Sequence, residues 1–179
     1  ASVRELTEVR VYAPRFSRVV DFVEEMAPQV SCRLVVVKSS CEAVDGADII
    51  TAATASSEPV FAGGDVAPGT HINGVGSFRL DMREMDQQTV GRCDRIVVDL
   101  RESALHEAGE LVAAEGAGAT SSERWLELSS LLADPLLGRS NDQEITLFKS
   151  VGHAVQDLFA GQRAIANAER LGLGQIIEI

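Results

Sequence analysis

Aromatic residues are scarce in this sequence, and so are patterns that bind metals. Phe, Trp and Tyr make up 4% of the 179 residues, so the core must be built mainly from Val, Leu, Ile and Ala. The thiols and imidazoles are Cys32, Cys41, Cys93, His71, His106 and His153. The cysteines are odd in number, form no CxxC pair and share no ligand spacing with the histidines. The sequence therefore predicts no metal site and reduced thiols.

Basic residues are also few: 16 Lys and Arg stand against 27 Asp and Glu, which gives a net charge of −11. This charge argues against a nucleic acid or an anionic membrane as partner, because either would be repelled. The chain shows neither a signal peptide nor an apolar run long enough to span a bilayer. With reduced thiols, these features predict a cytoplasmic protein with no membrane partner.

The hydrophobic pattern predicts an α/β fold. Apolar runs typical of buried strands alternate with segments of helical length, which indicates a mostly parallel sheet with helices on both faces. We expect strands over 8–13, 33–38, 48–53, 70–75, 94–100 and 145–149. We expect helices over 17–26, 42–46, 86–90, 102–110, 122–133 and from Ser150 to about 171, with Ser150 as the cap of the last. Residues 3–9 have the spacing of a helix end, and 175–179 have the pattern of a last strand without an obvious partner.

One stretch, from Gly69 to Asp86, has the pattern of a site. A short alternating strand meets Gly76-Ser77, where the chain can turn sharply, and a charged loop then leads to Asp86, a helix-capping residue. In an α/β sheet, ligands bind beyond the carboxyl ends of strands. The alternative is an ordinary connection between a strand and a helix, and this segment alone leaves both open.

The chain resembles the ornithine cyclodeaminase/mu-crystallin family of nicotinamide-dependent enzymes over essentially its whole length. The residues that carry the resemblance are Val11-Tyr12, 43–54 (AVDGADIITAAT), 69–86, Val98-Asp99, Glu107-Ala108-Gly109, 148–152 (FKSVG) and Asp157. The Gly69–Asp86 stretch and FKSVG are specific together, whereas the Val-Asp-Gly-Ala-Asp part of 43–54 occurs in many Rossmann domains.

The resemblance implies an incomplete Rossmann-type, doubly wound parallel sheet. Residues 1–149 would form a partial NAD(P)-binding domain, and residues 150–179 a helix and strand that return to a substrate and dimerisation domain. The family's first Rossmann strand, its GxGxxG turn and the basic residues of the substrate domain have no counterpart here. We therefore expect a fragment that binds dinucleotide poorly alone, and a homodimer when complete.

For the cofactor, the resemblance implies NADP or NAD, and the turn after the 8–13 strand favours NADP. This turn holds Arg15 and Arg18 and has no acid before Asp21, and guanidinium groups suit the extra phosphate of NADP. The alternative is that both arginines are solvated surface residues.

Four further residues match family positions along the cofactor: Thr54, Ala55, Val75 and Ser150. Each has a simpler alternative. Thr54 and Ala55 could be small residues required by a tight loop, Val75 could pack on the core, and Ser150 could only cap a helix.

Two residues match the substrate side, and no catalytic residue is assigned. Glu107 matches a substrate-side glutamate, with an exposed helix glutamate as the alternative. Asp81, Arg83 and Glu84 are expected to form an ion-paired loop, and Arg79 is a weaker candidate for a substrate carboxylate.

Phe78 decides between activities within the family. Ornithine-deaminating members have an aspartate at this place, and a phenyl ring can neither accept a proton nor pair with a cation. The sequence therefore predicts hydride transfer between NAD(P)H and the C–N bond of a cyclic imine or amino acid, as in ketimine reductases. Ornithine cyclodeamination and a non-catalytic, mu-crystallin-like binding protein remain the alternatives.

Overall fold

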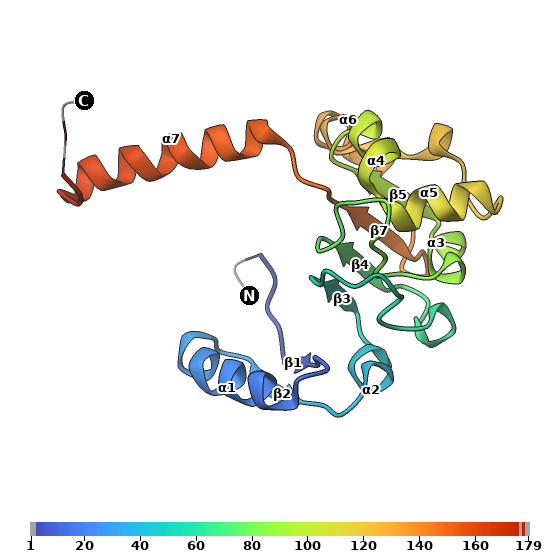
Figure 1. Cartoon of the computed structure of the whole chain (residues 1–179), viewed down its shortest axis with the longest axis horizontal. Helices are drawn as coiled ribbons and strands as arrows, with labels where there is room; N and C mark the ends of the chain where they lie inside the picture. The colour runs from blue at the N-terminus through green and yellow to red at the C-terminus, as the bar shows by residue number, and fades with distance from the viewer. Residues whose placement is uncertain (1–2, 176, 178–179) are drawn as a thin grey trace.

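The computed structural model describes residues 3–175 and residue 177, and it contains two parallel sheets (Figure 1). In the smaller sheet, β1 (Glu8–Val11) pairs with β2 (Arg33–Val36). The larger sheet has the order β3-β4-β7-β5-β6. Its strands are β3 (Ile49–Ala52), β4 (His71–Gly74), β5 (Arg95–Val98), β6 (Leu126–Glu127) and β7 (Thr146–Lys149). Every strand pair is parallel, which confirms the predicted α/β class.

The helices connect these strands and follow the sequence prediction in most places. They are α1 (Phe16–Met26), α2 (Ser40–Val44), α3 (Gln87–Arg92), α4 (Arg101–Glu107), α5 (Gly109–Gly116), α6 (Leu128–Ala133) and α7 (Ala154–Leu171). Asp86 caps α3 as predicted, because its carboxylate accepts a hydrogen bond from the Thr89 N–H at 2.6 Å. No helix of residues 3–175 combines the length and the apolar character needed to cross a membrane.

The two sheets fit one doubly wound sheet from which a strand is absent. Within the described residues, β1 pairs only with β2, and β3 pairs only with β4. The Rossmann strand order is 3-2-1-4-5-6. The order β2-β1 matches the 3-2 part, and β3-β4-β7 matches 4-5-6, so the place of strand 1 lies between the edges of β1 and β3. Within residues 3–175, no strand occupies that place.

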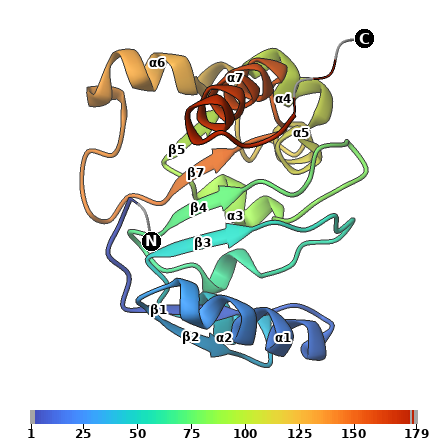
Figure 2. The same ribbon diagram turned by 90° about the vertical axis from the view of Figure 1, so that its left-hand side faces the viewer.

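The core lies on one face of the larger sheet, under α3 and α5 (Figure 2). Ile72, Val98, Leu111, Trp125 and Leu147 are fully buried there. The opposite face is partly open, since in β3 only Ile50 and Ala52 are buried while the other two residues are exposed. The prediction that the 48–53 strand is covered on both faces is therefore wrong, because no described helix covers this face in front of β3 and β4.

Helix α7 extends away from the sheet (Figure 1), and none of its described residues is buried. Its cap is His153, whose ring accepts a hydrogen bond from the Val155 N–H, so the prediction that Ser150 caps this helix is wrong. The predicted strand over 175–179 falls mainly on residues 176, 178 and 179, which lie outside the described residues.

Three other expectations are corrected by tertiary contacts. Residues 3–6 form bends and coil rather than a helix end. The predicted 102–110 helix divides into α4 and α5 at Ala108, because Gly109 packs so closely under the 79–82 loop that a Cβ would overlap the Met82 carbonyl. The predicted 122–133 helix is broken by β6, where Leu126 pairs with Val97 beside the buried Trp125.

Candidate functional site

The carboxyl ends of three neighbouring strands form one edge of the larger sheet. Strands β3, β4 and β7 are parallel, so the loops that follow them leave the sheet on the same side. The loops touch: the Val75 N–H donates to the Ala52 carbonyl at 2.9 Å, and the Ser150 N–H donates to the Gly74 carbonyl at 3.0 Å. The structure thus brings the exit loops containing Thr54, Val75 and Ser150 together at the sheet edge where α/β proteins bind ligands.

Glu84 joins two of these loops. Its side chain is fully buried, and the carboxylate accepts hydrogen bonds from the N–H groups of Thr54, Gly76 (2.9 Å) and Ser77 (3.2 Å). Thr54 belongs to the β3 exit loop, whereas Gly76 and Ser77 belong to the turn after β4. One buried carboxylate therefore satisfies main-chain donors that would otherwise be unpaired in both loops.

Gly76 is required by how closely these loops approach each other. A Cβ at this position would overlap both the backbone of Thr54 and the Glu84 carboxylate. Any side chain would push the β4 turn away from the β3 loop, so the glycine serves close backbone approach here. The chain bends at Gly76, and the glycine is needed there because the two loops pack so closely.

A second network of buried polar side chains binds Ser77. The Lys149 ammonium donates to the Ser77 carbonyl at 2.6 Å and to its hydroxyl at 2.7 Å, and it lies 3.1 Å from the Glu110 carboxylate. The Ser77 hydroxyl donates to Glu110 at 2.7 Å. All three side chains are buried. The turn after β4 is therefore fixed by strand β7 and helix α5 as well as by Glu84.

Asp99 organises the loop after β7. Its carboxylate accepts hydrogen bonds from the Ser150 hydroxyl at 2.5 Å and from the N–H groups of Val151 and Gly152 at 3.1 and 3.2 Å. Ser150 thus lies at the predicted edge, but its hydroxyl donates to Asp99 rather than capping a helix.

The side chains that flank the turn after β4 are exposed to solvent. Val75 is 43% exposed and Phe78 is 49% exposed, although Ser77 between them is buried. Thr54 and Ala55 are exposed beside them on the β3 loop. The edge therefore presents small and apolar side chains on a backbone that buried polar groups hold in place.

The remaining predicted site residues are all exposed. Arg15 directly precedes α1, and Arg18 lies in its first turn; both are exposed at the carboxyl end of β1, in the smaller sheet. Arg79 is exposed and makes two hydrogen bonds of 3.1 Å to Asp81. Glu107 is the exposed last residue of α4.

Sequence reasoning did not identify the buried polar residues that build the edge. We expected Glu84 in an ion-paired loop, and this is wrong: the ion pair of that loop is Arg79 with Asp81, while Glu84 binds the main chain. Lys149 stands at the end of an apolar strand, and a cation in such a run was the available indication that it needs a buried partner.

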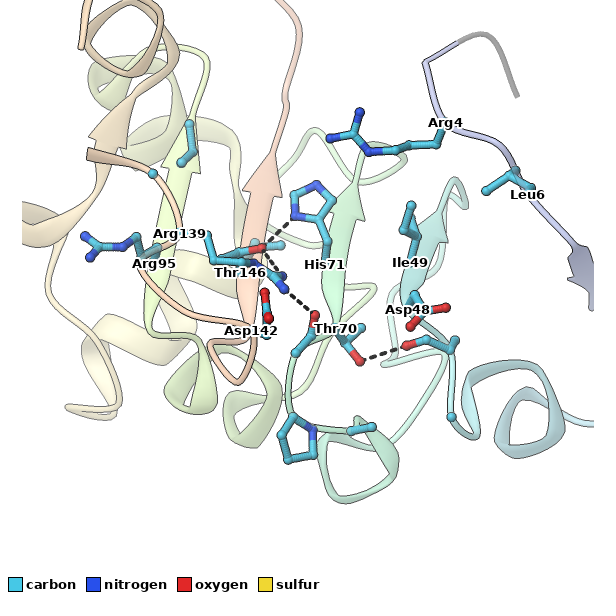
Figure 3. A pocket seen from close by; sticks show the side chains of 18 of the residues that line it. Arg4, Leu6, Asp48, Ile49, Thr70, His71, Arg95, Arg139, Asp142 and Thr146 are labelled. Atoms are coloured by element: carbon cyan, nitrogen blue, oxygen red, sulfur yellow. Dashed lines mark hydrogen bonds between the residues drawn. The ribbon is translucent and has the colours of Figure 1, made fainter. Parts of the chain in front are cut away.

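A separate hollow of about 990 Å³ lies on the open face of the larger sheet, toward the amino ends of its strands (Figure 3). Its lining includes Gly69, Thr70 and His71 from the start of the Gly69–Asp86 stretch, but none of the cofactor or substrate residues named individually from the sequence. His71 lies on its wall, with a ring nitrogen 2.8 Å from the Thr146 hydroxyl, and Arg139 bonds the same hydroxyl. Burial lowers the pKa of His71, and the nearby Arg139 adds to this effect, against a hydrogen bond with Asn73.

The cysteines and metal-binding side chains form no centre in the described part of the chain. Cys32, Cys41 and Cys93 are free thiols, and no three His, Cys, Asp or Glu side chains of these residues group to hold a metal. Burial raises the pKa of Cys93 to about 12, so this thiol is protonated and inert at neutral pH.

Comparison with known proteins identifies the relatives of this chain. At 33% identity, the chain is similar to a Delta(1)-pyrroline-2-carboxylate reductase of Bacillus cereus over 99% of its own length and 54% of that protein. It is 34% identical to the ketimine reductase mu-crystallin of Macropus fuliginosus over 87% of this chain and 45% of that one. The chain thus spans about half the length of the curated relatives it matches.

A solved structure with the same fold is that of Thermococcus litoralis Delta(1)-pyrroline-2-carboxylate reductase in complex with NADH and L-proline. It superposes with a TM-score of 0.93 at 36% identity, covering 98% of this chain and 55% of that one. The profile of the ornithine cyclodeaminase/mu-crystallin family matches residues 1–170. The resemblance seen in the sequence is confirmed, and the chain belongs to the ornithine cyclodeaminase/mu-crystallin family.

Proposed function

We propose that the protein passes a hydride from NADPH or NADH to the C=N bond of a cyclic imine carboxylate of the pyrroline-2-carboxylate kind. The observation that carries the proposal is the edge beyond β3, β4 and β7. Its exposed side chains are small or apolar, and the carboxylates that touch its loops, Glu84, Asp99 and Glu110, already accept hydrogen bonds. A protonated imine needs only a hydride to become an amine, so an apolar edge suffices.

The residues of this edge suit the nicotinamide end of the cofactor. Thr54, Ala55 and Val75 are exposed next to main chain that is hydrogen-bonded to the buried Glu84, which suits contact with a flat ring. When bound there, the nicotinamide would supply the hydride. The chain's own part is to orient the ring and to keep the reacting face apolar, with Ser150 at the neighbouring loop.

The described residues do not supply the pyrophosphate contact. That contact needs a glycine-rich turn between a strand and a helix amino end. The strand-to-helix turn after β2 holds Ser39, which caps the short α2, and no strand of residues 3–175 takes the strand-1 position. We therefore expect residues 1–179 alone to bind NADPH weakly, with no saturation of its fluorescence in the micromolar range.

For the adenosine end, we propose NADPH as the preferred cofactor. Arg15 and Arg18 are exposed at the carboxyl end of β1, and neither forms an ion pair with another described residue. Two free guanidinium groups at this position suit a phosphate. On the substrate side, we propose Glu107 and, more weakly, Arg79, which would have to exchange Asp81 for a substrate carboxylate.

We propose that residues 1–149 are the cofactor half of a homodimeric, cytoplasmic enzyme and that residues 150–179 belong to its substrate and dimerisation domain. The exposed apolar side chains of α7 support this division, because a helix with such a face normally packs on another element. They include Val155, Leu158, Phe159 and Ile165.

The test compares two substrates, using the polypeptide in its full encoded length. We expect robust oxidation of NADPH with pyrroline-2-carboxylate and little or no ammonia from ornithine. Ammonia release matched by proline formation would establish the cyclodeaminase alternative. Tight cofactor binding without turnover of either substrate would establish the non-catalytic binding protein.

A further inference from the structure

Glu84 and Glu110 are both buried beside the turn after β4, but they have different kinds of partner. Glu110, the other buried glutamate of this region, pairs with the Lys149 ammonium. Glu84 is as buried as Glu110, yet among the described residues its carboxylate meets three main-chain N–H groups and no cation. Those N–H groups belong to the two loops that carry Thr54 and Val75.

The main chain around Glu84 follows the β3 exit loop as well. The Arg83 N–H donates to the Ser56 carbonyl at 2.7 Å, and the Val60 N–H donates to the Glu84 carbonyl at 3.0 Å. The segment 83–84 therefore lies along the loop 54–60 and extends its carboxylate across to the turn after β4. Among the described residues, the Glu84 carboxylate is thus the side chain that hydrogen-bonds the main chain of both loops.

We infer that Glu84 is a positioning residue, which fixes the β3 loop and the β4 turn as one unit so that Thr54 and Val75 hold the nicotinamide ring at one angle to the imine. This inference rests on the proposed function. Misplacing reacting groups by about 1 Å can cost about a hundredfold in rate. Loosening these loops should therefore affect hydride transfer more than cofactor affinity.

The variant Glu84→Gln tests this with almost no change in shape. A glutamine has one acceptor oxygen and one NH2 group, so its NH2 must face either the Thr54 N–H or the pair from Gly76 and Ser77. One loop thus loses its acceptor. The matched control is Glu58→Gln, which removes an exposed carboxylate from the same β3 loop. Ile145→Val, at the opposite end of the sheet, controls for lost stability alone.

In Glu84→Gln we expect amide hydrogen exchange to accelerate about tenfold or more in the loop that loses its acceptor, which is either at Thr54 or at Gly76 and Ser77. In the full-length protein we expect kcat with pyrroline-2-carboxylate to fall tenfold or more, the KM for NADPH to change less than threefold, and the isotope effect of deuterated NADPH to rise. Both controls should keep the wild-type isotope effect, including Ile145→Val if it melts earlier.

Unchanged exchange, or faster exchange with an unchanged kcat and isotope effect, would overturn the inference. If the wild type reduces no imine, the proposed function is wrong. The inference about Glu84 is then tested by whether NADPH slows hydrogen exchange at the amides of Thr54, Gly76 and Ser77. Protection by millimolar NADPH in the wild type but not in Glu84→Gln would support positioning, and equal protection in both, or in neither, would contradict it.

Discussion

The middle of this chain, from α2 to β7, and its two flanks, which are β1, α1 and β2 on one side and α7 on the other, differ in how far their apolar side chains are buried. The buried cluster that forms the core runs from Val44 to Leu147, and it takes no member from β1, α1, β2 or α7. The flanks have apolar side chains too, but Phe16, Phe22 and Phe159 are about half exposed or more. The middle is therefore a body that packs on itself, while the flanks present surfaces for another layer.

This difference in burial indicates which part of the proposed site is formed by well-packed elements. A two-stranded sheet and a single extended helix are marginal alone, because neither buries much apolar area. The edge beyond β3, β4 and β7 belongs to the body, whereas Arg15, Arg18 and α7 belong to the flanks. The nicotinamide end of the proposed site is thus preformed, and its other contacts depend on the flanks.

The largest effect should come from breaking the buried ion pair of the body. Lys149→Met leaves Glu110 buried without its cation, and removing one partner of such a pair costs about 3–5 kcal/mol. Urea denaturation should show this as a lower free energy of unfolding. Replacing Glu110 by Leu as well should restore part of the loss, and a cost below about 1 kcal/mol for Lys149→Met would contradict the burial described here.

Replacing one leucine of the body and one leucine of a flank by alanine tests whether the two regions differ in packing. Leu147 in β7 is fully buried, so Leu147→Ala should cost about 2–5 kcal/mol in unfolding free energy. Leu158 in α7 is 58% exposed, so Leu158→Ala should stay within about 0.5 kcal/mol in residues 1–179. Similar losses for both, measured by the same denaturation, would show that α7 is packed like the body.

The cofactor preference should respond to the arginines of the first flank. Replacing Arg15 and Arg18 together by Ala should raise the KM of the full-length protein for NADPH about tenfold or more, because a charge-assisted contact contributes about 1.5–3 kcal/mol. The KM for NADH should hardly change. Equal effects on the two cofactors in steady-state assays would show that neither arginine meets the 2′-phosphate.

The smallest effect concerns pH and the open face. The folded pKa of His71 lies below its ordinary value of 6.5, so the unfolded chain binds its proton at a higher pH than the folded one. His71 therefore contributes stability above pH 6.5 that is lost as the pH falls from 6.5 through the folded pKa. In His71→Gln this part of the pH dependence of the melting temperature should disappear; His106→Gln, on the exposed side of α4, should keep it.

Much of the fold could be predicted because its causes are local. Alternating or continuous β-branched runs became strands within one or two residues at their ends, and Asp86 indicated the start of α3. Leu126 could not be predicted as a strand residue, because its pairing with Val97 joins segments far apart in the sequence. The division between α4 and α5 likewise depends on Gly109 meeting the 79–82 loop.

The site followed the same rule. Thr54, Val75 and Ser150 were named because they match family positions, and they lie near one another because parallel strands end at one edge. Their contact with the cofactor stays a prediction. Glu84 was missed because it stands in the charged segment DMREMD, which has the composition of a solvated loop. Its burial exists only once that segment lies along the β3 loop, and no local pattern contains this contact.

The most direct measurement of the central claim is where the cofactor touches the chain. Titrating isotopically labelled residues 1–179 with NADPH to millimolar concentration, and following amide signals by NMR, detects even weak binding. We expect the shifts to gather at Thr54, Val75, Gly76 and Ser150, with smaller ones near Arg15. Shifts centred instead on His71, Arg139 and Thr146 would place the cofactor in the hollow of the open face and contradict the account.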